Sequence, residues 1–463
     1  MKRVCCAAKQ DKDKISYLPD AIQAHILSFL PLVDAILTSL LSRQWRYSCC
    51  SLSNLEFIQH TVEEKNLGGN SGKIVEFVDQ VLRCHDVSRI DTIILSVRVD
   101  NAPITSDHLE QWASFAVTHR VQTFGLGDCS SPTGCDTLLP CCLFTCATLT
   151  RLKLWNIKLK FPKIESICFP MLRSLSLQDT KLSSDKFFSA PHCPSLLKLV
   201  IKRCKFKRLF ISLPSLKKLL IVDSNSNPNI SLSIPNIRNL YCCTEGAPRY
   251  ISTKTLSSSR RVCFFFSKKR LSSLDKSRHR SLASKIQKGL HNVEKLVMGR
   301  FYIEYLMKNP KYLIDSPAAP HSNLKKLKFS YSSKNQVQAI KLLLRSFPKL
   351  KDLSMKFEEH PSVSDVDDID GYWQSNATQS AGNMFKYLKI VELQRFKGRD
   401  SEVELARYLL QNARGLEKMK IRYPGHEIVS EENKAAIKAK LLSFPSGSPN
   451  LEIWMCEASD VLN

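Results

Sequence analysis

A short apolar triplet, with hydrophobic residues at positions x, x+3 and x+5, recurs along most of this 463-residue chain. One copy offers too few apolar side chains to form a core, so the copies must stack against one another. This requirement constrains the fold more than any other feature of the sequence. The better copies are Leu149/Leu152/Leu154, Leu172/Leu175/Leu177, Leu196/Leu199/Ile201, Leu216/Leu219/Ile221, Ile237/Leu240/Cys242, Val293/Leu296/Met298, Leu324/Leu327/Phe329, Leu350/Leu353/Met355, Leu388/Val391/Leu393 and Leu416/Met419/Ile421.

The spacing of these triplets is typical of a leucine-rich repeat, in which the last two positions alternate on a short strand and point into the core. Copies from Leu149 to Ile237 begin twenty to twenty-four residues apart, enough for one strand and a short return segment. Prolines such as Pro170 and Pro348 often precede the strand, where they remove no ladder hydrogen bond. The pattern predicts an α/β solenoid, or horseshoe, with helices inserted in the longer, later repeats. Two earlier candidate copies are Ile90/Ile93/Leu95 and Val121/Phe124/Leu126.

The series is interrupted between Cys242 and Val293. We interpret this gap as a degenerate repeat with an exposed basic loop at residues 254–280, which are rich in Ser, Lys and Arg. The clusters Lys268-Lys269-Arg270 and Arg278-His279-Arg280 have the form of a split nuclear-import signal, although clusters of this size are usually solvated loops. A cytoplasmic location, a nuclear location or both are consistent with the sequence.

The composition is strongly basic, with 68 Lys plus Arg against 43 Asp plus Glu and a net charge of +25. Such a charge attracts acidic proteins, nucleic acids or anionic surfaces, and does not choose among them. The 17 cysteines are scattered, which favours reduced thiols over a disulfide framework. Residues 1–13 read as a flexible tail without the apolar core of a secretory signal. No apolar run is long enough to suggest contact with a membrane interior.

The outward positions of the ten triplets carry much of the positive charge. Twelve of these thirty positions are basic, and only Asp352 and Glu392 are acidic. An ordinary solvated surface would mix the two signs. We therefore expect an acidic or phosphorylated protein substrate, or an anionic cofactor, over the middle and later repeats. The candidate substrate-binding residues are Arg151, Lys153, Lys198, Lys202, Lys326, Lys328, Lys418, Lys420 and Arg422, and Lys218, Lys295 and Lys356 complete the basic set.

Motifs for catalysis or metal binding are incomplete. The glycine-rich segment 68–73 lacks the first glycine and the final Ser or Thr of a phosphate-binding loop, so it reads as a linker. The acidic run 365–371 lacks the end ligands of a calcium loop. The cysteines between Cys129 and Cys146 have no C-x-x-C spacing and no nearby histidine. We expect a non-catalytic chain that needs no cofactor or metal.

The amino-terminal segment has a different pattern. Pro19 stands in the first turn of a predicted helix on which Ile22, Ile26 and Leu30 repeat at i, i+4 and i+8. Leu27 and Phe29 are expected to project away from that stripe, so one neighbouring helix could not cover every apolar side chain. Pro31 ends this helix, and Asp34 is the expected cap of the next. A module this small needs a partner to complete its core.

Three segments carry a resemblance to plant F-box/LRR proteins. The phrase from Leu18-Pro19 to Trp45-Arg46 resembles a plant F-box, although Gln44 and Cys49-Cys50 depart from the family pattern. The helix at 74–82 is similar to the one that joins F-box and repeats, and segments at 388–393, 402–413 and 416–419 resemble the FBD region. The resemblance gives a domain order: tail 1–13, F-box 14–57, linker-helix region 58–89, repeats 90–385, then FBD region and end of the solenoid 386–463.

The resemblance implies the substrate-recognition subunit of an SCF-type ubiquitin ligase. Its F-box would dock on a Skp-type adaptor, and through it reach the cullin and RING subunits that support ubiquitin transfer. A scaffold without a role in degradation and a basic nucleic-acid-binding repeat protein remain as alternatives, although no RNA- or DNA-binding motif accompanies the charge. The candidate adaptor-binding residues are Leu18, Pro19, Ile22, Ile26, Leu27, Leu30, Pro31, Leu41 and Trp45.

Overall fold

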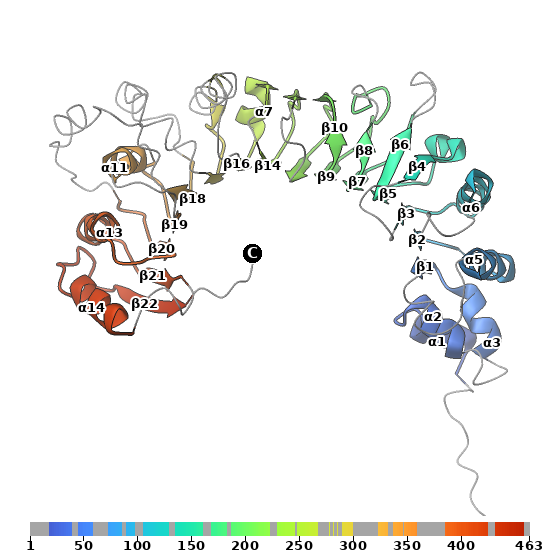
Figure 1. Ribbon diagram of the computed structural model, residues 1–463, viewed down its shortest axis with the longest axis horizontal. Helices are drawn as coiled ribbons and strands as arrows, with labels where there is room; N and C mark the ends of the chain where they lie inside the picture. The colour runs from blue at the N-terminus through green and yellow to red at the C-terminus, as the bar shows by residue number, and fades with distance from the viewer. Residues whose placement is uncertain are drawn as a thin grey trace, which may run out of the picture. The chain divides into compact units, whose positions relative to one another are not determined.

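The chain forms two compact units, Met1–Phe206 and Lys207–Asn463. Both are built from parallel strands with helices on one side of the sheet (Figure 1). A computed structural model describes residues 18–38, 45–58, 73–85, 89–97, 105–128, 135–160, 168–182, 187–222, 229–245, 248–266, 277, 281, 285, 289–299, 323–331, 337–345, 347–358, 385–424 and 431–457.

The first unit begins with the helical F-box module. Its helices are α1 (Asp20–Leu27), α2 (Leu32–Thr38) and α3 (Trp45–Ser48). A buried polar contact joins α1 to α3: the Ser48 hydroxyl donates to Gln23 Oε1 at 2.7 Å, while Gln23 Nε2 donates to the Leu18 carbonyl at 2.8 Å. This contact satisfies a Gln23 side chain that is fully buried.

Two expectations about this module were wrong. Leu27 does project away from the Ile22, Ile26 and Leu30 stripe, but it needs no partner to cover it, because its exposed fraction is 0% in the module's own core. The second helix begins at Leu32, where the Ala35 amide already donates to the Pro31 carbonyl at 2.9 Å. Asp34 therefore lies within the first turn and is not the cap.

The repeat sheet of the first unit has the strand order β1-β2-β3-β5-β7-β9, and each of its neighbouring strand pairs is parallel. A smaller sheet follows the ends of these strands, in the order β10-β8-β6-β4. The bounds are β1 (Asn54–Ile58), α5 (Lys73–Cys84), β2 (Thr92–Val97), α6 (Ser106–Thr118), β3 (Thr123–Asp128), β4 (Cys135–Leu138), β5 (Arg151–Trp155), β6 (Ile157–Lys160), β7 (Ser174–Gln178), β8 (Lys181–Leu182), β9 (Lys198–Lys202) and β10 (Lys205–Phe206).

Strand β1 lies in the last residues assigned to the F-box. It pairs with β2, with Leu55 opposite Ile93 and Phe57 opposite Leu95. Leu52, Leu55 and Phe57 are buried at the x, x+3 and x+5 spacing, so they form one more copy of the triplet. The repeat sheet therefore begins before residue 58 instead of at residue 90.

The second unit continues the same local design. Its repeat strands follow the order β12-β14-β16-β17-β18-β19-β20-β21-β22, beside a small sheet ordered β11-β13-β15. The bounds are β11 (Leu209–Ile211), β12 (Lys218–Val222), β13 (Ile230–Leu232), β14 (Asn239–Thr244), β15 (Tyr250–Ile251), α7 (Thr253–Ser258), β16 (Arg261–Phe266), β17 (Lys295–Met298), β18 (Lys326–Tyr331), α11 (Val337–Arg345), β19 (Asp352–Phe357), β20 (Ile390–Gln394), α13 (Asp400–Asn412), β21 (Lys418–Tyr423), α14 (Glu431–Leu442) and β22 (Glu452–Glu457).

The supposed basic loop at 254–280 begins with ordered structure, which corrects that boundary. Helix α7 and strand β16 occupy Thr253 to Phe266, and β16 pairs with β14 and β17. The repeat escaped the triplet pattern because Ser259 stands at its first apolar position. Ser259 is fully buried, and its hydroxyl donates to the Thr255 carbonyl at 2.7 Å.

At the carboxy-terminal end, the strands of the predicted FBD region join the repeat sheet, because β20 pairs with β19 and with β21. Strands β20 and β21 pair in register and flank α13, whose side chains Val403, Leu405, Leu409 and Leu410 are buried as expected. One further strand, β22, pairs with β21. Its triplet was missed because Asn450 stands where the first apolar residue would be.

Several sequence calls lie outside the described residues. These are Leu41, the tail 1–13, the basic clusters at 268–270 and 278–280, the acidic run at 365–371, and Cys129. Among the helices that are described, none has the length and apolar character needed to cross a bilayer.

Candidate functional site

The first candidate surface is apolar and lies on α1 and the turn after it. Ile22 and Ile26 stand one helical turn apart, so they share a face of α1. Phe29 and Leu30 follow in the turn. The Phe29 ring packs edge to face with the His25 ring, with 4.9 Å between the two ring centroids. We call this surface the F-box face; its exposed fractions are Ile22 48%, Ile26 38%, Phe29 75% and Leu30 40%.

The other predicted adaptor-binding residues divide into two groups. Pro19 and Pro31 are exposed beside the F-box face, and Leu18 is half-buried. Leu27 and Trp45 are buried, at 0% and 9%, so they support the module and offer little surface to a partner. Phe29 was absent from the predicted binding set, although its exposure is the largest on this face. The signal was available, because Phe29 falls in the turn between the helix and Pro31.

The second candidate surface is the open face of each repeat sheet, which we define as the side opposite the buried triplet residues. Alternation along the strands places the predicted substrate-binding residues there. Arg151 and Lys153 lie on β5 and Lys198 and Lys202 on β9, all in the first unit. The others lie in the second unit: Lys326 and Lys328 on β18, and Lys418, Lys420 and Arg422 on β21.

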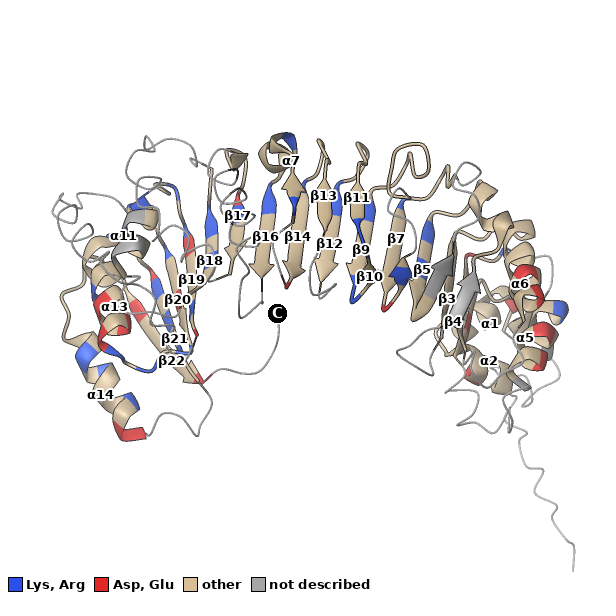
Figure 2. Ribbon diagram, turned by 45° about the horizontal axis from the view of Figure 1, so that its top comes forward, with Lys and Arg blue, Asp and Glu red and all other residues tan. Residues whose placement is uncertain are grey.

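In the second unit, neighbouring strands bring carboxylates to several of these cations. Lys326 Nζ lies 2.5 Å from Asp352 Oδ2, and Arg422 Nε lies 2.7 Å from Glu392 Oε1. Lys418 Nζ lies 3.9 Å from Glu452 Oε2 and 4.5 Å from the centre of the Trp454 ring. Both charge signs accordingly appear around β20 and β21 in Figure 2. The later repeats are less uniformly positive than their sequence suggests.

In the first unit, the corresponding cations are not neutralised in this way. Figure 2 marks basic residues along β5 and β9. No carboxylate within the described part of the chain forms an ion pair with them, and the outward positions of the intervening β7 are Ser174, Ser176 and Gln178. We call Arg151, Lys153, Lys198 and Lys202 the basic face.

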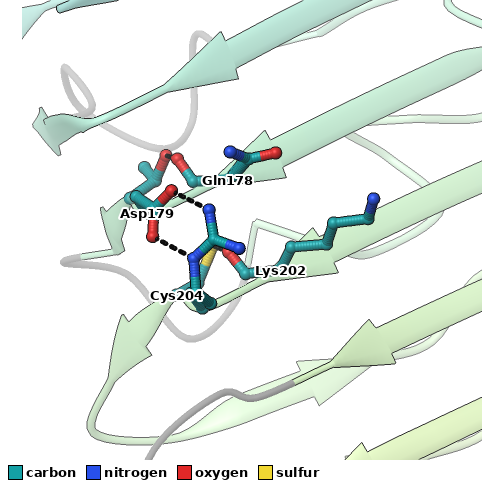
Figure 3. Close-up of polar contacts among 6 residues, drawn as sticks. Gln178, Asp179, Lys202 and Cys204 are labelled. Atoms are coloured by element: carbon teal, nitrogen blue, oxygen red, sulfur yellow. Dashed lines mark hydrogen bonds and ion pairs between the residues drawn. The ribbon is translucent and has the colours of Figure 1, made fainter. Parts of the chain in front are cut away.

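A carboxylate that follows the end of β7, Asp179, is already paired. Asp179 accepts two hydrogen bonds from Arg203, to Oδ1 from Nε at 2.7 Å and to Oδ2 from Nη2 at 2.6 Å. This guanidinium lowers the pKa of the Asp179 carboxyl. Figure 3 shows the Lys202 side chain extending away from that pair. Lys202 is thus left to the open face.

The described cysteines are free thiols. Cys193, Cys204 and Cys242 are completely buried and act as small core side chains. Burial raises the pKa of Cys193 and of Cys242 to about 12. Within the described ranges, His, Cys, Asp and Glu side chains do not gather in threes or more as a metal site would require.

A helical module with an exposed apolar face, followed by stacked parallel strands, defines a leucine-rich repeat protein with an amino-terminal F-box. Family models match in the same order: the F-box domain at residues 15–57, the LRR repeats of "FBD-associated F-box protein At5g56370" at 109–258, and FBD at 386–421. The chain therefore has the F-box, LRR and FBD regions that plant F-box/FBD/LRR-repeat proteins carry, in the same order. F-box/LRR proteins are generally non-catalytic substrate adaptors of SCF-type ligases, and an F-box generally binds a Skp-type adaptor.

Relatives from Arabidopsis thaliana support this assignment over most of the chain. F-box/FBD/LRR-repeat protein At5g56420 is 32% identical over 223 residues, which cover 46% of this chain and 50% of the relative. FBD-associated F-box protein At5g22730 is 24% identical over 96% of this chain and 94% of its own length. Putative F-box/FBD/LRR-repeat protein At4g03220 is 28% identical over 89% of both chains.

Proposed function

We propose that this chain is the substrate-recognition subunit of an SCF-type ubiquitin ligase. Its F-box face docks a Skp-type adaptor, and the open face of its repeats binds a protein substrate. The observation that carries the proposal is the F-box face itself: four large apolar side chains exposed together on a small helical module. Isolated exposed hydrophobic residues are ordinary, but a contiguous apolar patch is typical of a protein–protein contact.

The arrangement of these four side chains also supports docking, because one partner surface could bury them all. Ile22 and Ile26 project from one side of α1, and Phe29 and Leu30 extend that surface beyond the helix end. Covering an apolar side chain of this size stabilises a complex by about 1.5–3 kcal/mol before association costs. The buried Gln23–Ser48 contact holds α1 against α3, so the face is preformed for a partner.

Adaptor binding is tested with purified full-length chain and a purified Skp-type adaptor. Replacing Ile26→Asp together with Phe29→Asp should abolish binding, because both side chains would carry charge into an apolar contact. Met171→Asp is the matched control, since Met171 is 42% exposed on the same unit but distant in sequence from the F-box face. Unaltered adaptor binding by the double variant would reject the assignment of this surface.

Substrate capture is tested in cells with the proteasome and cullin activation inhibited. Affinity purification should recover the adaptor, the cullin and proteins whose abundance rises when the chain is deleted. Recovery of the adaptor and cullin without any such protein would favour the non-degradative scaffold. Recovery of nucleic acid in place of the adaptor would favour the basic nucleic-acid-binding protein.

A further inference from the structure

The strand register arranges the open face of the first unit as a grid around β7. One row contains Arg151, Ser174 and Lys198; the next contains Lys153, Ser176 and Val200. Adjacent strands are about 4.8 Å apart, so the cations of β5 and β9 flank the serines across about 10 Å. Short hydroxyl side chains thus form the floor between two lines of long basic side chains.

The third row adds an aromatic platform. It contains Gly127, Trp155, Gln178 and Lys202. A Cβ added to Gly127 would meet the indole ring of Trp155, and one added to Gly125 would lie 3.4 Å from the same ring. The indole therefore lies over the backbone of β3, in space that the glycines leave open. Trp155 is half-buried, so part of this residue remains exposed to a partner.

We propose that this grid binds a phosphorylated serine or threonine in an extended peptide, with the phosphate above Ser174 and Ser176. Arg151 and Lys153 reach the phosphate from one side and Lys198 and Lys202 from the other, while the serine hydroxyls donate from below. The proposal rests on the proposed function in taking the open face as the substrate surface. It goes further by naming the chemical group that is recognised and the place where it binds.

A phosphate fits this arrangement better than a carboxylate. A phosphoserine carries a charge of about −1.5 to −2 and three acceptor oxygens, whereas a carboxylate carries one charge and two oxygens. Four cations and two hydroxyls around one position supply more donors than a carboxylate can accept. Asp179 follows the end of β7 and is paired with Arg203, so its carboxylate does not compete with the phosphate for the cations of the basic face.

The position of Trp155 adds a sequence preference beside the phosphate. The Cα atom of Trp155 lies one strand and two residues from that of Ser176, a separation of about 8 Å, and the indole lies about one strand further away, over β3. Side chains two residues apart on one side of an extended peptide are separated by about 7 Å. A long aromatic side chain two residues from the phosphoresidue, directed across β5, is therefore needed to reach the indole over β3. Single-stranded nucleic acid is favoured less, because its binding sites usually offer a series of stacking rings and β5, β7 and β9 offer only Trp155 on this face.

The test measures binding of fluorescent peptides to the purified full-length chain by anisotropy, without the adaptor. The probes are degenerate peptides with a central phosphoserine and phenylalanine two residues away on either side. The comparison probes carry Ser or Asp at the centre, and a single-stranded oligouridine of equal length reports nucleic-acid binding. We expect the phosphopeptides to bind at least about tenfold more tightly than each comparison probe.

Variants locate the site. Lys153→Glu with Lys198→Glu should lower phosphopeptide affinity by at least about tenfold, and Lys153→Gln with Lys198→Gln should lower it by less. The matched control, Lys181→Glu with Lys205→Glu on the exposed positions of the small sheet in the same unit, should remain within about twofold of the native chain. Trp155→Ala should abolish the preference for phenylalanine over alanine two residues from the phosphate, while retaining the preference for phosphate. Thermal unfolding checks that each variant is folded.

The outcomes separate this inference from the proposed function. Equal binding of the Asp-centred peptide, tighter binding of oligouridine, or full binding by the Lys153/Lys198 variants would overturn the phosphate site. None of those results would affect adaptor binding by the F-box face. Conversely, phosphopeptide binding by a chain that does not bind a Skp-type adaptor would support this inference and reject the proposed function.

Discussion

The F-box face and the basic face belong to the same unit and differ in nearly every chemical respect. The F-box face consists of exposed aliphatic and aromatic side chains on a short helix and its following turn. The basic face consists of four cations on strands held in register by a buried leucine core. Burial of the first depends on the hydrophobic effect, while attraction to the second depends on charge that salt screens. We therefore expect one unit to recognise its two proposed partners independently.

The largest effect is expected when a buried side chain of the F-box module is replaced and the result is compared with replacement of an exposed one. Leu27→Ala removes a side chain with no exposed area and should destabilise the module by about 2–5 kcal/mol. Ile26→Ala removes an exposed neighbour and should change the stability by about 1 kcal/mol or less. Hydrogen exchange across α1 to α3 measures both. Equal loss of protection in the two variants would mean that the exposed face is part of the module's own core.

The next largest effect is expected on phosphopeptide affinity, when a carboxylate is introduced among the cations of the basic face. In the second unit, carboxylates already lie beside the corresponding cations. Ser176→Glu places an acid between Lys153 and Lys198, as Glu392 and Asp352 lie beside cations in the second unit. The phosphopeptide affinity should fall by about 1.4 kcal/mol, a factor of ten. Adaptor affinity should not change. Undiminished peptide binding would show that this row is not the contact surface.

A smaller effect is expected from the reverse experiment in the second unit. Glu392→Gln with Glu452→Gln removes the carboxylates beside Arg422 and Lys418. Exposed ion pairs contribute about 0–1 kcal/mol each, so the stability should change little. The freed cations should add a weak second phosphopeptide site, which titration calorimetry would detect as an increased stoichiometry. An unchanged stoichiometry would mean that charge alone does not distinguish the two open faces.

The smallest effect concerns the Asp179–Arg203 pair at the edge of the basic face. Because Arg203 lowers the pKa of Asp179 in the folded unit, the folded unit binds fewer protons than the unfolded chain. The pair therefore stabilises the unit above about pH 4, the unfolded pKa, and this contribution is lost as the pH falls through the folded pKa. Asp179→Asn, which suits the positive φ of 51° there, should lose more stability at pH 6 than at pH 2. Urea unfolding at both pH values measures the difference, and an equal loss at both would contradict the pairing.

The sequence predicts the repeat strands well because each buried strand needs its triplet. It fails where a polar residue replaces the first apolar position, as with Ser259 and Asn450, or where a strand falls inside another module, as with Leu52 to Phe57. The hydroxyl of Ser259 is satisfied locally, so the repeat tolerates it. A search for apolar spacing therefore misses a repeat in which a polar residue occupies one of the apolar positions.

The candidate surfaces were only partly predictable. Apolar spacing identifies α1 but does not tell Leu27, which is buried, from Ile26, which is exposed. The count of charged residues identifies the cations on the open faces of both units. The ion pairs of Lys326 and Arg422 cannot be predicted in this way, because they depend on which strand lies next in the sheet. The row that joins Lys153 to Ser176 likewise requires strand register. These features become visible only when residues far apart in the chain are placed side by side.

A salt titration of both interactions on one preparation tests the central claim most directly, namely that two surfaces of different chemistry recognise two partners. Affinities for the Skp-type adaptor and for the phosphopeptide would be measured from about 50 to 500 mM salt, across which the Debye length falls from above to below 10 Å. We expect adaptor affinity to stay nearly constant while phosphopeptide affinity falls steeply. A parallel decline of both affinities, or a phosphopeptide affinity that does not respond to salt, would contradict the account.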